Sequence, residues 1–145
     1  MKITKNFTLE ELYKSSTANR LKIDNTPKQE YKDNLVSLAE DILQPIRDAW
    51  GAPLIVSSGY RCEKLNQKIG GAKNSDHKYG CACDIHTVED TVAKNKDLFN
   101  LIVQMAKEGK IKCRQILDEY GYNWVHISRN NKYNSWKDNQ VLHIK

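Results

Sequence analysis

The sequence lacks any long hydrophobic run and any segment that resembles an export signal. Its longest apolar stretches, residues 54–56 and 98–103, fall far short of the roughly 20 residues that a membrane span requires. The N-terminal segment turns acidic early and has neither the apolar core nor the small-residue cleavage site of a signal peptide. We therefore expect no membrane span, no signal peptide and synthesis in the cytoplasm.

Cysteine, proline and glycine are scarce, with four Cys, three Pro and seven Gly among 145 residues. A chain of this length buries roughly 68–70% of the surface that its unfolded form exposes, so neither a disulfide nor a metal is needed to hold a core. We expect one domain over residues 1–145, with four free thiols and with any metal serving function. A thiolate metal site is disfavoured, since C-x-C at residues 81–83 is not the usual ligand spacing.

No Arg-rich stripe is present, although 23 basic residues against 18 acidic ones leave a net charge of +5. This scattered excess favours weak attraction to polyanionic surfaces over sequence-specific reading of nucleic acid. Trp50, Trp124 and Trp136 are expected in the core and at its rim rather than as platforms for base stacking. We expect no nucleic-acid partner.

Capping signals locate the N-terminal helices. Thr8-Leu9-Glu10-Glu11 is a capping box, which predicts a short helix to about Tyr13, followed by a polar loop over residues 15–25. Thr26, with proline next, predicts the cap of a long helix that ends at Gly51. The apolar stripe of this helix comprises Leu35, Leu38, Ile42, Ile46 and Trp50. Pro45 falls inside the pattern and predicts a kink.

The remaining pattern predicts short strands and one further helix. Residues 54–58 and 141–144 are β-prone, and residues 90–109 carry a helical apolar stripe that stops at a glycine. Residues 115–120 and 123–128 face each other across a Gly-Tyr turn and predict a hairpin. The expected fold is α+β, with N-terminal helices packed on one side of a small, mainly antiparallel sheet.

Two histidines and an aspartate suggest a metal site. His77, on a predicted loop, precedes Asp84, on a predicted strand, by seven residues. A catalytic zinc site needs three protein ligands and one open position, and His126 is the natural third candidate because it lies mid-strand between apolar neighbours. His86 lies two residues after Asp84 and therefore on the same face of the strand. It is a spare ligand, a group that supports the ligands, or a partly exposed polar residue.

The parity of the hairpin selects the acid that could assist the metal. With a two-residue turn, Tyr120 pairs with Asn123 and Glu119 lies on the same face as His126, where it suits a general base. Asp118 then lies on the opposite face. A three-residue turn reverses this parity and makes Asp118 the base.

Five motifs occur in an order that resembles the M15 zinc peptidases, the D-Ala-D-Ala carboxypeptidase family. They are Ser57-Ser58-Gly59-Tyr60-Arg61, Leu65-Asn66, Gly70-Gly71-Ala72, Ser75-x-His77-x-x-Gly80-x-Ala82-x-Asp84-Ile85 and Trp124-Val125-His126-Ile127-Ser128. The match extends from about Phe7 to the second hairpin strand and is similar to the short single-domain branch found in phages and bacteria. The resemblance implies a hedgehog/DD-peptidase-like fold and a Zn²⁺ cofactor.

The resemblance also implies roles for single residues. His77, Asp84 and His126 would be the zinc ligands, Arg61 would hold a substrate carboxylate or carbonyl, and Ser75 would bind substrate or orient its loop. Many relatives place the catalytic acid three residues before the last histidine, but here that residue is Asn123. Glu119, which ends the upstream segment Gln-Ile-Leu-Asp-Glu, is then the expected base.

The resulting expectation is a monomeric zinc peptidase that hydrolyses a stem-peptide bond of peptidoglycan, as a D-Ala-D-Ala carboxypeptidase does. One alternative is an L-Ala-D-Glu endopeptidase that acts as a phage lysin after release from the cytoplasm or from the virion. Another is a non-catalytic zinc-binding or wall-binding module, which the asparagine at position 123 would permit.

Overall fold

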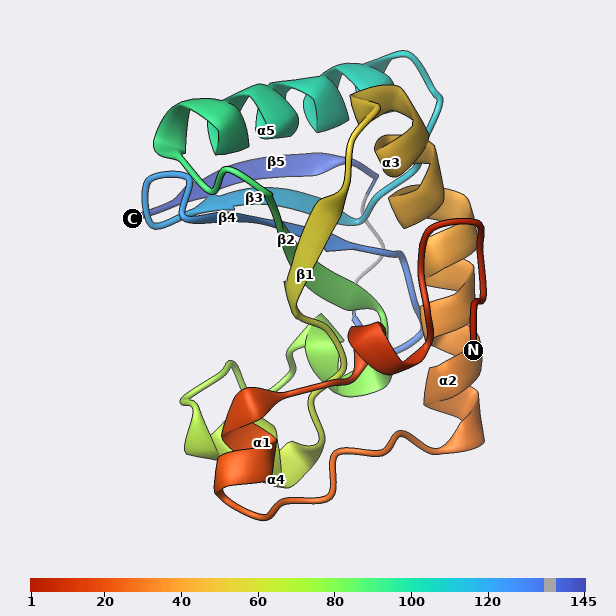
Figure 1. Ribbon diagram of the computed structural model, residues 1–145, viewed down its shortest axis with the longest axis vertical. Helices are drawn as coiled ribbons and strands as arrows, with labels where there is room; N and C mark the ends of the chain where they lie inside the picture. Colours follow the sequence, from red (N-terminus) through yellow and green to blue (C-terminus); the bar gives the residue numbers. More distant parts are fainter. Residues whose placement is uncertain (135–137) are drawn as a thin grey trace.

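The computed structural model describes residues 1–134 and 138–145, and a five-stranded sheet forms its centre (Figure 1). The strand order is β1-β2-β4-β3-β5. The strands are β1 (Leu54–Ser58), β2 (Ala82–Thr87), β3 (Gln115–Glu119), β4 (Trp124–Ser128) and β5 (Gln140–Ile144). Three of the neighbouring pairs are antiparallel, and β5 lies parallel to β3. The prediction of a small, mainly antiparallel sheet is confirmed.

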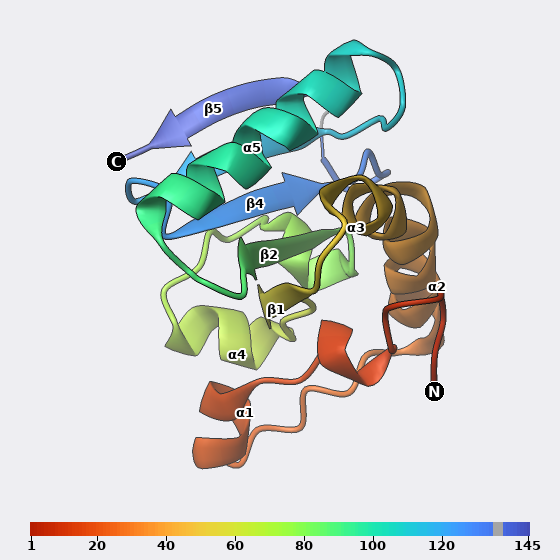
Figure 2. The same cartoon turned by 45° about the horizontal axis from the view of Figure 1, so that its top comes forward.

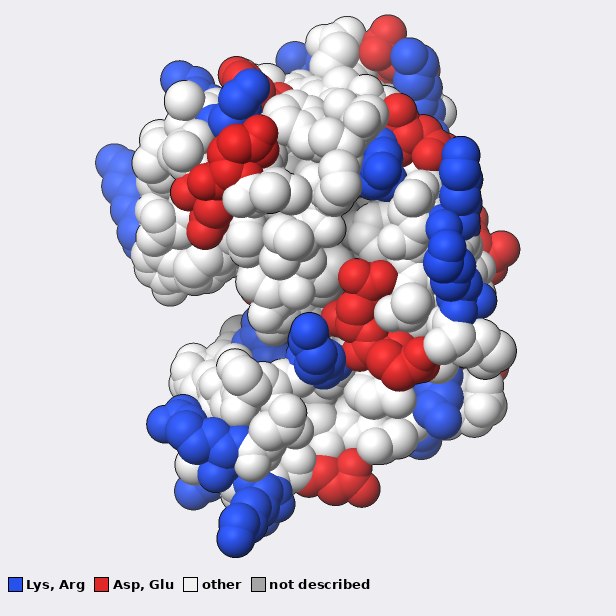
Figure 3. Space-filling model, viewed as in Figure 1, with Lys and Arg blue, Asp and Glu red and all other residues white. Residues whose placement is uncertain are grey.

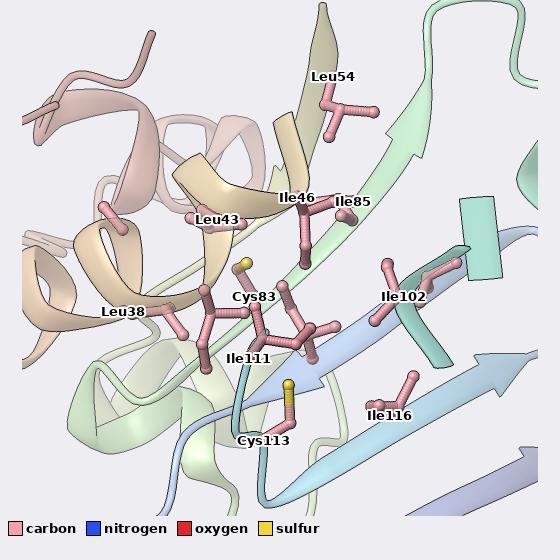
Figure 4. Close-up of a cluster of buried hydrophobic side chains, with 14 of the residues drawn as sticks. Leu38, Leu43, Ile46, Leu54, Cys83, Ile85, Ile102, Ile111, Cys113 and Ile116 are labelled. Atoms are coloured by element: carbon pink, nitrogen blue, oxygen red, sulfur yellow. The ribbon is translucent and has the colours of Figure 1, made fainter. Parts of the chain in front are cut away.

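A layer of helices covers one face of this sheet (Figure 2). It consists of α2 (Gln29–Leu38), a π-helical turn η2 (Ala39–Leu43), α3 (Gln44–Trp50) and α5 (Val92–Lys107). Figure 4 shows side chains such as Ile46 and Ile102 directed from these helices toward Cys83 and Ile116 of the sheet. The helices form because each carries an apolar stripe that is buried only against this face. The prediction of an α+β fold is confirmed.

Shorter helical elements lie outside this layer. They are η1 (Glu10–Leu12), α1 (Ser16–Arg20), α4 (Glu63–Lys68) and η3 (Asp76–Tyr79). The capping box before η1 forms as predicted: the Glu11 amide donates to Thr8 Oγ1 at 3.2 Å, and the Thr8 amide donates to Glu11 Oε1 at 2.6 Å.

Two predictions for the N-terminal part of the chain are wrong, one about an element and one about where a helix begins. Residues 16–20, predicted as loop, form α1, because Ser15 caps the helix by accepting from the Ala18 amide at 3.1 Å and Ala18 packs in a small cluster with Ile23 and Leu65. Helix α2 begins at Gln29, after a Lys28 cap, rather than at the predicted Thr26 cap. The Thr26 amide instead donates to Asp24 Oδ1 at 3.0 Å, in a turn that competes with helix initiation.

Pro45 distorts the long helix without ending it. Because proline has no amide hydrogen, the bond to the carbonyl four residues earlier is lost, and the π-helical turn η2 ends two residues before Pro45. Gly51 ends α3 in the left-handed conformation, as predicted. Trp50 packs at the edge of the core, whereas Trp136 lies outside the described residues.

The hairpin keeps the predicted register with a different turn. Four residues, 120–123, connect β3 to β4, so the predicted pairing of Tyr120 with Asn123 is wrong. Glu119 pairs with Trp124 and Leu117 with His126, as predicted. A four-residue connection preserves parity because it differs from a two-residue turn by an even number.

Within residues 1–134 and 138–145, none of the helices has both the length and the apolar character that crossing a bilayer would require.

Candidate metal centre and active site

A cleft of about 720 Å³ lies on the sheet face opposite the helical layer. Because side chains alternate along a strand, Asp84, His126 and Glu119 point into this cleft, while Cys83 and Ile85 enter the core. Other walls come from residues 57–58, from Arg61, and from residues 69–72 and 74–77. Figure 3 shows the surface hollowed between the sheet and the part of the molecule that contains α1 and α4.

His77 enters the cleft from η3. The Ser75 hydroxyl caps this element by accepting from the His77 amide at 3.2 Å. The buried imidazole has its Nδ1 2.7 Å from the Gly59 carbonyl, which accepts the ring proton. This bond selects the tautomer whose Nε2 lone pair faces the cleft, as a metal ligand requires.

Asp84 and His126 face each other directly across the β2–β4 pair. His126 Nδ1 lies 2.9 Å from Asp84 Oδ1 and 3.2 Å from His77 Nε2, and the third side, from His77 Nε2 to Asp84 Oδ1, is 3.3 Å. All three residues are buried. The structure therefore brings together the three predicted ligands, from a loop helix and two strands.

This triangle fits a tetrahedral metal ion. Zinc bound to nitrogen and oxygen at about 2.0–2.1 Å separates its ligand atoms by about 3.3 Å. The three sides of the triangle, 2.9, 3.2 and 3.3 Å, lie close to that value, and all three residues line the cleft. Two imidazoles and one carboxylate are the donor set of a catalytic site that keeps a position for water or substrate.

The charges of the site favour cation binding. Burial would raise the pKa of Asp84, but His77 and His126 beside it lower this pKa below its ordinary value, so the group is a carboxylate. Burial lowers the pKa of His77, against the attraction of Asp84, which favours the neutral imidazole. A carboxylate and a neutral imidazole are the protonation states that bind a metal. Against the effect of burial, Asp84 and Glu119 raise the pKa of His126, so a metal ion would displace a proton from that ring.

Glu119 lies beside the triangle and Asp118 does not. Glu119 Oε1 is 3.7 Å from His126 Nδ1, and burial together with the charge of Asp84 raises the pKa of Glu119. Asp118 points to the other face, where it accepts from the Tyr122 amide at 2.6 Å and lies 3.0 Å from His143 Nδ1. Of the two candidate bases, only Glu119 faces the ligands.

Arg61 forms another side of the cleft. Its Nη2 lies 3.9 Å from Asp84 Oδ2, and its Nη1 donates to Asn66 Oδ1 at 3.1 Å. Its Nε is buried and has no hydrogen-bond partner among the described residues. A buried donor without a partner is costly, and a substrate oxygen would satisfy it.

Asn66 fixes Arg61 to the glycine-rich lip of the cleft. The side-chain Nδ2 of Asn66 donates to the Ala72 carbonyl at 2.8 Å, and the backbone carbonyl of Asn66 accepts from the Gly71 amide at 2.9 Å. A Cβ on Gly71 would lie 2.1 Å from Asn66 Oδ1 and 2.8 Å from Arg61 Nη1. The pair Gly70-Gly71, noted in the sequence, thus allows the backbone to approach these two side chains.

Sequence reasoning missed one buried ion pair. Arg114 Nη1 donates to Asp76 Oδ2 at 2.8 Å, and Asn131 donates to Asp76 Oδ1 at 3.0 Å. These bonds tie η3, which carries His77, to the residue before β3 and to the segment after β4. Arg114 and Asn131 are far from Asp76 in the sequence. The one available signal was Asp76 itself, an acid next to a predicted ligand, which needs a cation if it is buried.

His86 does not join the three ligands. Its Nδ1 lies 2.7 Å from the Thr87 carbonyl and 3.5 Å from Asp90 Oδ1, as expected of a partly exposed polar residue. The four cysteines are free, and burial raises the pKa of Cys81 and Cys113 to about 12, which agrees with packing rather than metal binding.

The cleft therefore has the arrangement of a metal-dependent hydrolytic site, with three ligands, an open position and an adjacent carboxylate. The chain belongs to peptidase family M15, whose model matches residues 5–128. This match includes every predicted site residue and confirms the resemblance found in the sequence.

A relative of known activity also matches. The zinc D-Ala-D-Ala carboxypeptidase of Streptomyces albus G is 46% identical over 44 residues, which are 30% of this chain and 17% of the relative. The match thus spans about one-sixth of the relative's length.

Proposed function

We propose that this protein is a zinc-dependent peptidase that cleaves a stem-peptide bond of peptidoglycan, in the manner of a D-Ala-D-Ala carboxypeptidase. The observation that carries the proposal is the buried triangle of His77, Asp84 and His126 with Glu119 on the same face of the cleft. Membership of a peptidase family and the name of the Streptomyces relative support the reaction and the metal.

The residues divide the work of peptide hydrolysis. Zn²⁺ held by His77, Asp84 and His126 would polarise the scissile carbonyl and lower the pKa of water in the open position. Glu119 Oε1 takes the proton of the attacking water and then delivers it to the leaving amine, for which its raised pKa is suited. Arg61 orients the substrate.

Arg61 is suited to the substrate carboxylate or the carbonyl next to the scissile bond. The guanidinium is a rigid fork, and Asn66 fixes one of its nitrogens while Nε remains without a partner among the described residues. Ser75, at the same cleft, orients the His77 loop through its cap.

The direct test is hydrolysis of a soluble stem pentapeptide, followed by mass analysis of the products. EDTA should abolish hydrolysis and Zn²⁺ should restore it, and a His126→Ala protein should be inactive while a His86→Ala protein stays active. Full activity of the folded His126→Ala protein would refute the proposal.

Digestion of purified walls distinguishes the bond that is cut. Free D-Ala identifies a carboxypeptidase, whereas stem peptides released from the sugar chains identify the alternative, an L-Ala-D-Glu endopeptidase. A fall in wall turbidity would support a lytic role after release from the cytoplasm. Metal binding without any product would identify a non-catalytic module.

A further inference from the structure

Six exposed cations gather on the part of the molecule that contains α1 and α4. We call this surface the basic lobe. It comprises Lys14, Arg20, Lys22, Lys64, Lys68 and Lys73. The two helices are joined by the small cluster of Ala18, Ile23 and Leu65, and both ribbon views place them side by side. Figure 3 shows Lys and Arg side chains concentrated there, below the hollow. Bases that are scattered along the sequence thus share one surface.

Two acids offset only part of the positive charge of the basic lobe. Residues 13–25 and 61–74 contain two acids, Asp24 and Glu63. Glu63 Oε2 pairs with Lys78 Nζ at 2.5 Å, and Asp24 accepts from the Thr26 amide. None of the six cations of the lobe forms an ion pair with another described residue. The lobe therefore presents charges that are free to bind an anionic partner.

The basic lobe borders the catalytic cleft. Helix α4 leads directly into residues 69–72, which line the cleft. A second hollow of about 210 Å³, lined in part by residues 14–17, shares Ser57, Ser58, Arg61 and Ile69 with the cleft. A polymer that lies on the lobe is thus held next to the reacting peptide.

The chemistry of the lobe fits phosphate groups rather than nucleic-acid bases. Five of its six cations are lysines, which bind phosphate as point charges on flexible stems. Tyr13 is the one aromatic residue in the two segments, so no platform for base stacking exists there. Helices α1 and α4 have five and six residues, too short to read a groove.

We propose that the basic lobe binds an anionic phosphodiester polymer attached to the cell wall, and that this contact keeps the cleft close to stem peptides. The inference rests on the proposed function, because that function places the protein on peptidoglycan.

The test compares two charge-reversed proteins. Lys64→Glu with Lys68→Glu removes charge from the lobe, and Lys94→Glu with Lys107→Glu is the matched control on α5, across the sheet. Co-sedimentation is measured with purified walls that retain their phosphodiester polymer and with the same walls after its chemical removal. Hydrolysis of the soluble pentapeptide and thermal unfolding are measured in parallel.

The lobe variant should bind intact walls at least about thirtyfold more weakly than the parent, since the loss of two cations that each contribute about 1 kcal/mol near an anionic surface amounts to about 2 kcal/mol. The control variant should bind more strongly than the lobe variant, and both should retain peptide hydrolysis. Removal of the polymer should weaken binding of the parent to the level of the lobe variant, and added salt should do the same.

Three results would overturn the inference. They are equal loss of wall binding in both variants, wall binding unaffected by polymer removal, and a lobe variant that loses duplex-DNA binding while it keeps wall binding. The last result would identify nucleic acid as the partner. Absence of peptide hydrolysis by the parent would refute the proposed function instead, because co-sedimentation does not depend on catalysis.

Discussion

At the scale of single residues, the structure separates two adjacent carboxylates by their surroundings. Asp118 is engaged by a backbone amide and by His143 on the core face of the sheet. Glu119 lies beside the predicted metal ligands, and burial and the charge of Asp84 raise its pKa. Only Glu119 is placed to move a proton in the cleft.

Replacement of Glu119 by glutamine should therefore lower kcat about 10²- to 10⁴-fold, because the side chain loses its basic oxygen but keeps its size. The matched variant is Asp118→Asn, which removes the neighbouring carboxylate and keeps an acceptor for the Tyr122 amide. It should retain most activity. Steady-state kinetics on the pentapeptide, with unfolding temperatures for both proteins, checks the prediction. A slow Asp118→Asn protein and a fast Glu119→Gln protein would reverse the assignment.

At the scale of elements, Gly59 joins three segments. Its carbonyl accepts from His77, and the next amide, of Tyr60, donates to the Leu12 carbonyl at 2.7 Å. A Cβ at position 59 would lie 2.0 Å from the Leu12 oxygen. The strand β1, the helix η1 and the ligand loop can meet only because this residue has no side chain.

A Gly59→Ala substitution should destabilise the protein by about 1–3 kcal/mol, since the new methyl group forces the backbone of η1 away. It should also weaken metal binding, because the bond that orients His77 moves. Gly109→Ala is the control: its φ is +76° and nothing lies within 4 Å of its added Cβ, so strain is confined to that residue. Urea unfolding and metal titration measure both effects. Equal metal affinity in the two variants would contradict the role given to Gly59.

At the scale of the whole molecule, the three candidate ligands come from η3, β2 and β4. The large core beneath the helical layer is apolar and independent of them. A bound metal would therefore stabilise a fold that already exists, rather than create it.

Chelation should accordingly lower the unfolding temperature without unfolding the protein at 25 °C. A metal at a thousandfold excess over its Kd contributes about 4 kcal/mol, or about 8–16 °C for a chain of this size. Differential scanning calorimetry with Zn²⁺ and with EDTA measures the shift, and the His126→Ala protein should show little of it. An unchanged transition in the parent would argue against metal binding by this cluster.

Several features were predictable because they depend on local chemistry. The capping box at Thr8 and the end of α3 at Gly51 follow from residue type, and the structure confirms them. The register of the hairpin was predicted only for a two-residue turn, and the four-residue connection has the same parity. Helix α1 was missed because its stability comes from packing of Ala18 against Leu65, more than 40 positions away in the sequence. Local polarity there resembles that of a loop.

The sequence by itself determined the α+β class and the family, since periodicity and ordered motifs are properties of the chain. The face of the hairpin that carries Glu119 depended on the length of the turn, which the structure decided. Only the tertiary structure decided that His77 meets Asp84 and His126 with a favourable tautomer, and that Asp76 is neutralised by Arg114. It also gathered the dispersed lysines of the basic lobe beside the cleft. Distances between residues remote in sequence depend on packing, and no local pattern encodes them.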